Sequence, residues 1–188
     1  MVTFMVQEGI IINEQVKGYS FSLKVLHWLS AIIIFGLFGL GFWMVELDYY
    51  SPYYQSAPAL HKSIGICYVV LLFARLVIRA FAELPSAIDS HHPIERAISS
   101  FVHRFFYFLL LLIVISGYLI STADGRAISV FELFEIPSLG SFVENQEDYA
   151  GDIHKWLAYG LIGLAVIHAL AAIKHQFVDK DQTLKRMF

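Results

Sequence analysis

The chain has 188 residues, of which 57% are hydrophobic and only 15% are charged, and its formal net charge is −3. Soluble domains typically carry about 25% charged residues, so this composition predicts an integral membrane protein. The sequence has no excess of basic residues to neutralise phosphates, which excludes nucleic acid as a partner. The single cysteine, Cys67, cannot form an internal disulfide, and we expect it to be a small buried residue.

Four apolar stretches are long enough to cross a hydrocarbon core of about 30 Å, which takes around 20 residues. They cover residues 25–46, 60–80, 99–121 and 153–175. We expect a membrane domain over residues 21–176, with tails at 1–20 and 177–188. The first tail lacks the basic start and the cleavage pattern of a secretory signal. The predicted fold class is an all-α integral membrane protein, a four-helix transmembrane bundle surrounded by lipid.

The basic residues near the ends of the spans predict the orientation. On one side they are Lys17, Lys24, Arg75, Arg79, Arg96, Arg104, Lys174, Lys180, Lys185 and Arg186. The other side has only Lys62, Arg126 and Lys155 near its loops. The positive-inside rule then places both termini and the loop between the second and third spans in the cytoplasm.

The outer loop at residues 122–152 is long and acidic. We expect a short amphipathic helix around residues 129–135. The loop region carries Arg126 against seven acidic residues, Asp124, Glu132, Glu135, Glu144, Glu147, Asp148 and Asp152. Such a surface suits a basic soluble partner and would repel a small anion.

Two histidines lie fourteen positions apart on the fourth span, His154 near its outer end and His168 nearer its inner end. Fourteen residues rise roughly 21 Å along a helix, and the two side chains differ by only about 40° around its axis. By depth, His61 on the second span pairs with His154, and His27 on the first span pairs with His168. A histidine inside a bilayer is costly and normally functional. Any one of them alone is as well explained by packing, but four at paired depths favour two stacked metal centres.

The kind of metal centre follows from the ligands. Ligation by histidine alone disfavours calcium and iron–sulfur sites, and zinc would need a closed tetrahedral set at one place. A haem iron with two axial imidazoles fits between antiparallel helices, and such a site transfers electrons and does not bind oxygen. Glycines beside such a site would leave space next to the helix backbone, unless they serve ordinary close helix packing. They are Gly36, Gly39, Gly41, Gly65, Gly160 and Gly163.

These histidines and their neighbours resemble the bacterial cytochrome b561 family. The resemblance covers about residues 18–187 and rests on His27-Trp28, on His61 with Gly65, on the His154/His168 pair, and on the tail at 175–187. The family is related to the cytochrome b subunits of nickel–iron hydrogenases and formate dehydrogenases. The resemblance implies a bundle in the bacterial inner membrane that encloses two b haems, with His27/His168 and His61/His154 as axial ligands. It also implies electron exchange with ubiquinone or another quinone.

Further residues gain candidate roles from this resemblance. His175, two turns beyond His168, could hydrogen-bond a quinone carbonyl or simply meet headgroups and water, and His103 is a second candidate for the quinone site. Arg75 is a candidate partner for a haem propionate, whereas Arg79 is expected to reach the cytoplasmic interface. We expect His91 and His92 to be solvated.

The leading hypothesis is a dihaem membrane cytochrome that moves electrons between the quinone pool and an unidentified periplasmic donor or acceptor. Two alternatives stay open: a superoxide oxidase that passes electrons to ubiquinone, and the membrane anchor of a larger dehydrogenase. A homodimer is a possible assembly of the cytochrome. A cofactor-free transporter is disfavoured because the spans show no inverted repeat.

Overall fold

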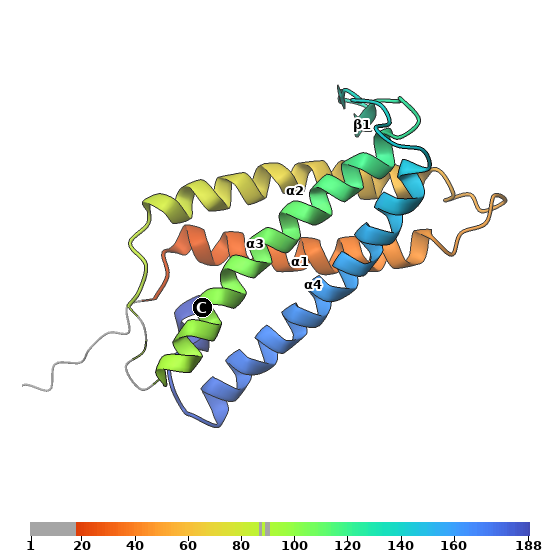
Figure 1. Cartoon of the computed structure of the whole chain (residues 1–188). Helices are drawn as coiled ribbons and strands as arrows, with labels where there is room; N and C mark the ends of the chain where they lie inside the picture. The colour runs from red at the N-terminus through yellow and green to blue at the C-terminus, as the bar shows by residue number, and fades with distance from the viewer. Residues whose placement is uncertain (1–17, 87, 89–90) are drawn as a thin grey trace, which may run out of the picture.

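Four long helices form the bundle in the computed structural model, which describes residues 18–86, 88 and 91–188 (Figure 1). The predicted tail at 1–20, Lys17 included, lies almost entirely outside the described residues. The helices are α1 (Phe21–Met44), α2 (Ser56–Phe81), α3 (Pro93–Thr122) and α4 (Gln146–Phe177). Each is long and apolar enough to cross a membrane, which confirms the predicted fold class.

All four helices begin earlier than the apolar stretches predict, and α3 and α4 do so by the most residues. α3 starts at Pro93, where the side chain of His92 accepts a hydrogen bond from the amide of Ile94 and Glu95 completes a capping box. α4 starts at Gln146 with acidic residues in its first turn. Hydropathy marks only the part of a helix that lipid covers, so these polar first turns were missed.

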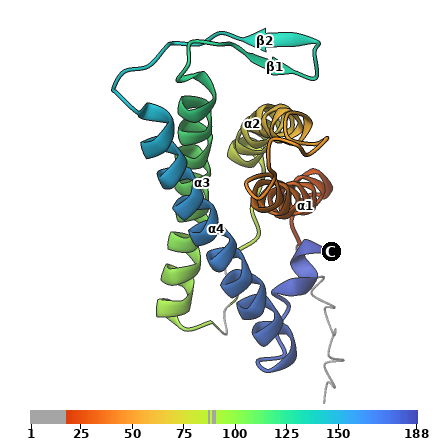
Figure 2. The same ribbon diagram turned by 90° about the vertical axis from the view of Figure 1, so that its right-hand side faces the viewer.

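The helices pack as two pairs, α1 with α2 and α3 with α4, and Figure 2 shows the pairs side by side. A small apolar core joins them at mid-depth and consists of Tyr68, Leu72, Leu109, Leu110 and Leu161. Most of the remaining large hydrophobic side chains are exposed, as expected for a surface that faces lipid. Cys67 is also exposed, so its predicted burial is wrong.

The outer loop contains a β-hairpin in place of the expected amphipathic helix. Strands β1 (Ile128–Val130) and β2 (Phe134–Ile136) pair antiparallel. Phe131 and Glu132 have φ values of 50° and 60°, the left-handed conformation of a type I′ turn. Ile128 and Val130 are fully buried, and the amide of Phe131 donates to Ser63 Oγ of α2 at 3.0 Å. This period-two burial against α2 favours a strand over a helix.

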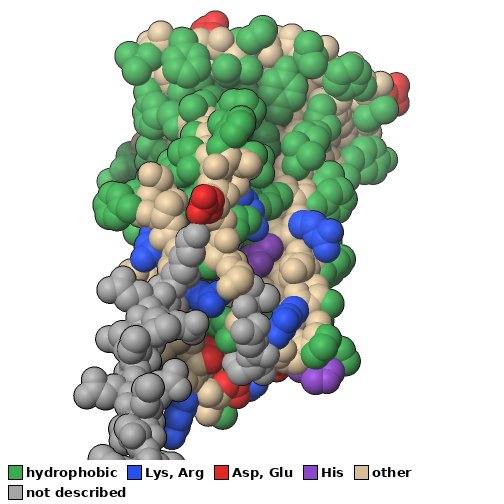
Figure 3. Space-filling view, turned by 90° about the vertical axis from the view of Figure 1, so that its left-hand side faces the viewer, with side chains coloured by type: hydrophobic (Ala, Val, Ile, Leu, Met, Phe, Trp, Pro, Cys, Tyr) green, Lys and Arg blue, Asp and Glu red, His purple; other side chains and the backbone are tan. Residues whose placement is uncertain are grey.

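The C-terminal tail returns to the start of α1 through the short 3-10 helix η1 (Leu184–Met187). Trp28 Nε1 donates to the carbonyl of Met187 at 2.9 Å, and the amide of Tyr19 donates to Arg186 at 3.1 Å. Figure 3 views the end of the bundle where the described termini lie, and charged side chains and histidines gather over its lower half. The tail therefore caps the same end of the bundle that holds His27 and His168.

Candidate functional site

The outer histidine pair joins α2 to α4. The ring centres of His61 and His154 are 6.3 Å apart, with 73° between the ring planes. Nδ1 of His154 lies 3.0 Å from the carbonyl of Ile113 and 3.1 Å from Ser116 Oγ. Because a carbonyl only accepts, the proton of this imidazole lies on Nδ1, and Nε2 keeps its lone pair. A histidine held in this way is oriented as metal-ligating histidines usually are.

Two glycines make room for the outer pair. A Cβ atom at Gly117 of α3 would lie 3.2 Å from Cε1 of His154, and one at Gly41 of α1 would lie 3.3 Å from Cε1 of His61. Each imidazole thus rests against the bare backbone of a neighbouring helix. Gly41 was among the glycines expected beside the site, whereas Gly117 was missed because it falls in the apolar run of α3.

The other predicted glycines do not serve close helix packing. Nothing among the described residues lies within 4 Å of a Cβ built at any of them, namely Gly36, Gly39, Gly65, Gly160 and Gly163. Ordinary helix–helix contact therefore does not explain these positions.

The inner pair joins α1 to α4. The ring centres of His27 and His168 are 6.4 Å apart, with 67° between the planes. The ring of His103 packs edge-on against His168 at 5.5 Å, and Phe106 does the same at 5.5 Å. His103 is therefore part of the surroundings of the inner pair.

Arg75 also reaches the inner pair, with Nη2 3.1 Å from Nδ1 of His27. A guanidinium only donates, so Nδ1 of His27 accepts in this contact and Nε2 of the neutral ring carries the proton. Metal ligation through Nε2 requires the opposite tautomer. If His27 held a metal ion through Nε2, Arg75 would have to turn away from Nδ1, and its guanidinium would then be free to pair with an anionic group.

Both pairs fit a metal ion held between two imidazoles. A metal–nitrogen distance of about 2 Å, plus about 1.1 Å from that nitrogen to the ring centre, places two opposed imidazole centres about 6 Å apart. The observed separations of 6.3 and 6.4 Å match this requirement. The pairs lie on opposite sides of the middle of α4, on either side of the apolar core, so the bundle offers two separate sites of one kind.

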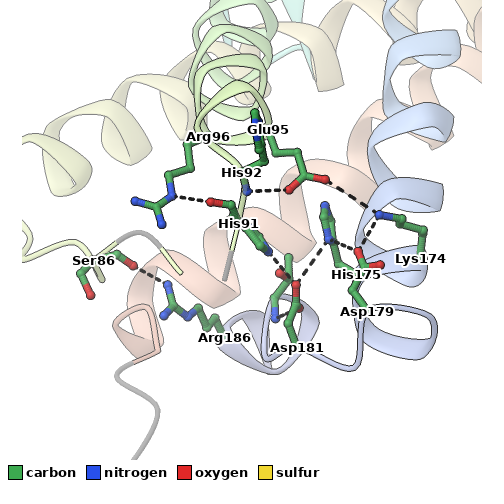
Figure 4. Close-up of polar contacts among 11 residues, drawn as sticks. Ser86, His91, His92, Glu95, Arg96, Lys174, His175, Asp179, Asp181 and Arg186 are labelled. Carbon is green, nitrogen blue, oxygen red and sulfur yellow. Dashed lines mark hydrogen bonds and ion pairs between the residues drawn. The ribbon is translucent and has the colours of Figure 1, made fainter. Parts of the chain in front are cut away.

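A polar cluster at the inner end brings together residues that the sequence interpretation kept apart (Figure 4). Nε2 of His91 lies 2.6 Å from Oδ2 of Asp181, and the His91 ring stacks on His175 at 4.5 Å. The side chain of His91 is only 17% exposed, so the prediction that it is solvated is wrong. His92 is exposed, as predicted, and caps α3. Ninety residues separate His91 from Asp181, and no local pattern could reveal the contact.

His175 faces two carboxylates. Its Nδ1 lies 2.7 Å from Oδ2 of Asp179 and 3.4 Å from Oδ2 of Asp181. Burial of Asp181 opposes its ionisation, but hydrogen bonds from His91 and Thr183 outweigh it and lower the pKa of Asp181. A hydrogen bond from Lys174 lowers the pKa of Asp179. Both carboxylates are therefore charged at neutral pH.

Comparison with known proteins agrees with this geometry. The family described as prokaryotic cytochrome b561 matches residues 18–188. The chain is 47% identical to cytochrome b561 homolog 2 of Escherichia coli K12 over 171 residues, which is 91% of each chain. It is 29% identical to a probable superoxide oxidase, CybB, of Yersinia pestis over 176 residues (91% of this chain, 96% of the relative). Cytochrome b561 homolog 1 of E. coli K12 is 26% identical over 167 residues (86% and 92%).

The family implies haem b, and the opposed imidazoles of the bundle are suited to hold it. Four spanning helices and a prokaryotic family place the protein in the bacterial inner membrane as a multi-pass protein. The chain therefore belongs to the prokaryotic cytochrome b561 family and is an electron-transfer cytochrome of that membrane.

Proposed function

We propose that this cytochrome holds two b haems, one between His27 and His168 and one between His61 and His154. It transfers electrons between a quinone at the inner end and a redox partner at the outer end. The observation that carries the proposal is the matched separation of the two histidine pairs, 6.4 and 6.3 Å, at two levels of one helix. A haem held by these histidines would supply one-electron transfer.

The residues around the pairs orient the ligands and keep them dry. The carbonyl of Ile113 fixes the tautomer and rotation of His154, and Ser116 supports the same nitrogen. The apolar core between the two histidine pairs, which includes Tyr68, Leu72 and Leu161, excludes water from the middle of the bundle. When little water surrounds a redox centre, less solvent has to reorganise each time the charge of that centre changes.

The inner end is assigned to the cytoplasm, with both termini on that side. The described Lys and Arg residues of the helix ends and tail at this end support the assignment through the positive-inside rule. Lys24, Arg186 and Lys185 lie in the segments that meet where the tail contacts α1.

His175 is proposed to bind the quinone, with His103 as a second contact. Nδ1 of His175 lies 2.7 Å from Oδ2 of Asp179, so Nε2 is the nitrogen that is left to contact the quinone. An Nε2–H at this position would donate to a quinone carbonyl. His103 packs edge-on against His168, with ring centres 5.5 Å apart, and so lies beside the inner pair.

Rapid anaerobic mixing of the purified cytochrome with reduced ubiquinol tests the proposal. Absorption bands of reduced haem b should appear, and they should appear more slowly in His175→Ala. The control is His92→Asn, which changes a nearby histidine but keeps a residue suited to cap α3. If ubiquinol reduces no haem in the intact protein, the quinone is not a substrate.

A second candidate is superoxide oxidation with ubiquinone as acceptor. A cavity of about 180 Å³ at the outer end is lined by Lys62, which follows the predicted ligand His61, and by Arg126. Two cationic side chains suit a small anion, although Asp124 pairs with Arg126 at 2.5 Å and offsets its charge. The chain is also 29% identical to a probable superoxide oxidase.

The acidic outer loop argues against this candidate and favours a basic protein partner. Stopped-flow mixing with superoxide distinguishes a superoxide oxidase from a cytochrome that reacts with a basic protein partner. Haem reduction that slows in Lys62→Gln and weakens with added salt supports the oxidase, and absence of haem reduction by superoxide removes it.

A further inference from the structure

A cluster of histidine and carboxylate side chains lies at the inner end, apart from the two ligand pairs. His91 comes from the segment before α3, His175 from the last turns of α4, and Asp181 from the tail before η1. One ligand atom from each lies within 4.8 Å of the other two. Figure 4 shows both imidazoles pointing toward the Asp181 carboxylate. Three separate segments of the chain therefore converge on one point.

The cluster is largely shielded from solvent. The exposed fractions of the side chains are 6% for Asp181, 16% for His175 and 17% for His91. Nδ1 of His175 is buried and has no partner with hydrogen-bond geometry among the described residues, although it lies near two carboxylates. A buried nitrogen in this state is normally satisfied by some partner, and a cation shared with the carboxylates would supply one.

We propose that His91, His175 and Asp181 form a binding site for a divalent transition-metal ion of the zinc class, with Asp179 as a fourth ligand. Two imidazoles with one or two carboxylates are a common ligand set for zinc, whereas calcium and magnesium prefer oxygen ligands alone. This site is distinct from the haem sites, because none of its residues belongs to the two ligand pairs.

The distances suit a tetrahedral ion. Bonds of about 2.1 Å to a tetrahedral ion place neighbouring ligand atoms about 3.4 Å apart. Nδ1 of His175 and Oδ2 of Asp181 are 3.4 Å apart. Two contacts are shorter, His91 with Asp181 at 2.6 Å and His175 with Asp179 at 2.7 Å, and each must open by less than about 1 Å, which a side-chain rotation provides.

The surrounding charges favour a cation. Asp179 and Asp181 are both ionised at neutral pH, since hydrogen bonds keep the pKa of each carboxyl low. Lys174 contacts Asp179 at 2.6 Å and opposes the ion, but it is 51% exposed and can turn toward Glu95, 3.9 Å away. The two carboxylates therefore outweigh the one lysine at the site.

A bound ion would join the α2–α3 connection, the end of α4 and the tail. It would also take Nδ1 of His175. Nε2 of His175 would then keep its proton, so the ion leaves the atom proposed to contact the quinone in place. Binding of the ion does not rest on the proposed function.

Isothermal titration of the haem-loaded, chelator-treated protein with Zn²⁺ tests the site. We expect about one tight ion per chain and at least about tenfold weaker binding in His91→Gln and in Asp181→Asn. His92→Asn is the matched control and should bind as the unmodified chain does. An unchanged haem spectrum in each variant shows that the bundle is intact, and His91→Gln changes only a connecting segment.

Zinc K-edge absorption of the loaded protein should show two imidazoles among nitrogen and oxygen ligands. Absence of a tight site, or equal affinity in His91→Gln and the unmodified chain, overturns the inference. Neither result touches the proposed function, because haem content and reduction by ubiquinol are measured in samples without Zn²⁺.

Discussion

Gly117→Val tests the role of bare backbone beside the outer pair. A Cβ atom at Gly117 would already lie 3.2 Å from Cε1 of His154, closer than almost all such contacts. The two γ-carbons of valine extend about 1.5 Å further, so at least one would overlap the ring unless the imidazole moves. Overpacking of this kind costs about 1–3 kcal/mol when the structure adapts.

The ring cannot move far and still serve as a ligand. Its Nδ1 is fixed by the carbonyl of Ile113 at 3.0 Å, and metal bonds tolerate deviations of only about 0.2 Å. We therefore expect Gly117→Val to lose the outer haem and keep the inner one, with haem per chain falling from about two to about one. Gly41→Val should produce the same loss from the opposite side, through His61.

Haem content by the pyridine haemochrome assay and a redox titration measure the effect. The matched control is Gly163→Val, because Gly163 is exposed and nothing among the described residues lies within 4 Å of its Cβ position. Gly163 follows His154 by nine residues and so lies about 180° around α4 from that ligand, on the face turned away from it. Gly163→Val should keep both haems. If Gly117→Val retains both haems with unchanged midpoint potentials, the proposed packing of His154 against Gly117 is refuted.

Three further substitutions test other parts of the account. His168→Ala should remove the inner haem and leave about one haem per chain, and retention of both would contradict the proposed pairing with His27. His175→Ala should keep both haems but slow reduction by ubiquinol, whereas an unchanged rate would make His175 an interfacial residue only. Ser116→Ala removes a polar contact to Nδ1 of His154. It should therefore shift the midpoint potential of the outer haem and leave the midpoint potential of the inner haem unchanged. A shift of the inner potential alone would contradict this assignment.

The four helices could be predicted from sequence because a bilayer demands about 20 apolar residues in each span. The proximity of His61 to His154, and of His27 to His168, could also be anticipated, since the depth of a residue follows from its position along a span. The β-hairpin of the outer loop could not be predicted from sequence. Its strands are short, and their extended conformation depends on the burial of Ile128 and Val130 against α2. Packing against α2, and not the local sequence, therefore determines that this segment forms strands.

Contacts between residues far apart in the chain could not be predicted from the sequence pattern either. Gly117 looks like any glycine in an apolar helix until its position beside His154 is known. His91 precedes a proline in a polar loop, and that local context suggested solvent. Its environment is instead set by Asp181, ninety residues away in the tail that folds back over the inner end.

The most direct measurement of the central claim is electron paramagnetic resonance of the oxidised protein, combined with haem quantification. Four imidazoles in two opposed pairs predict about two haems b per chain, each low-spin with two nitrogenous axial ligands. A colourless protein from haem-replete cells, or haem in a high-spin form with an open axial position, would contradict the account.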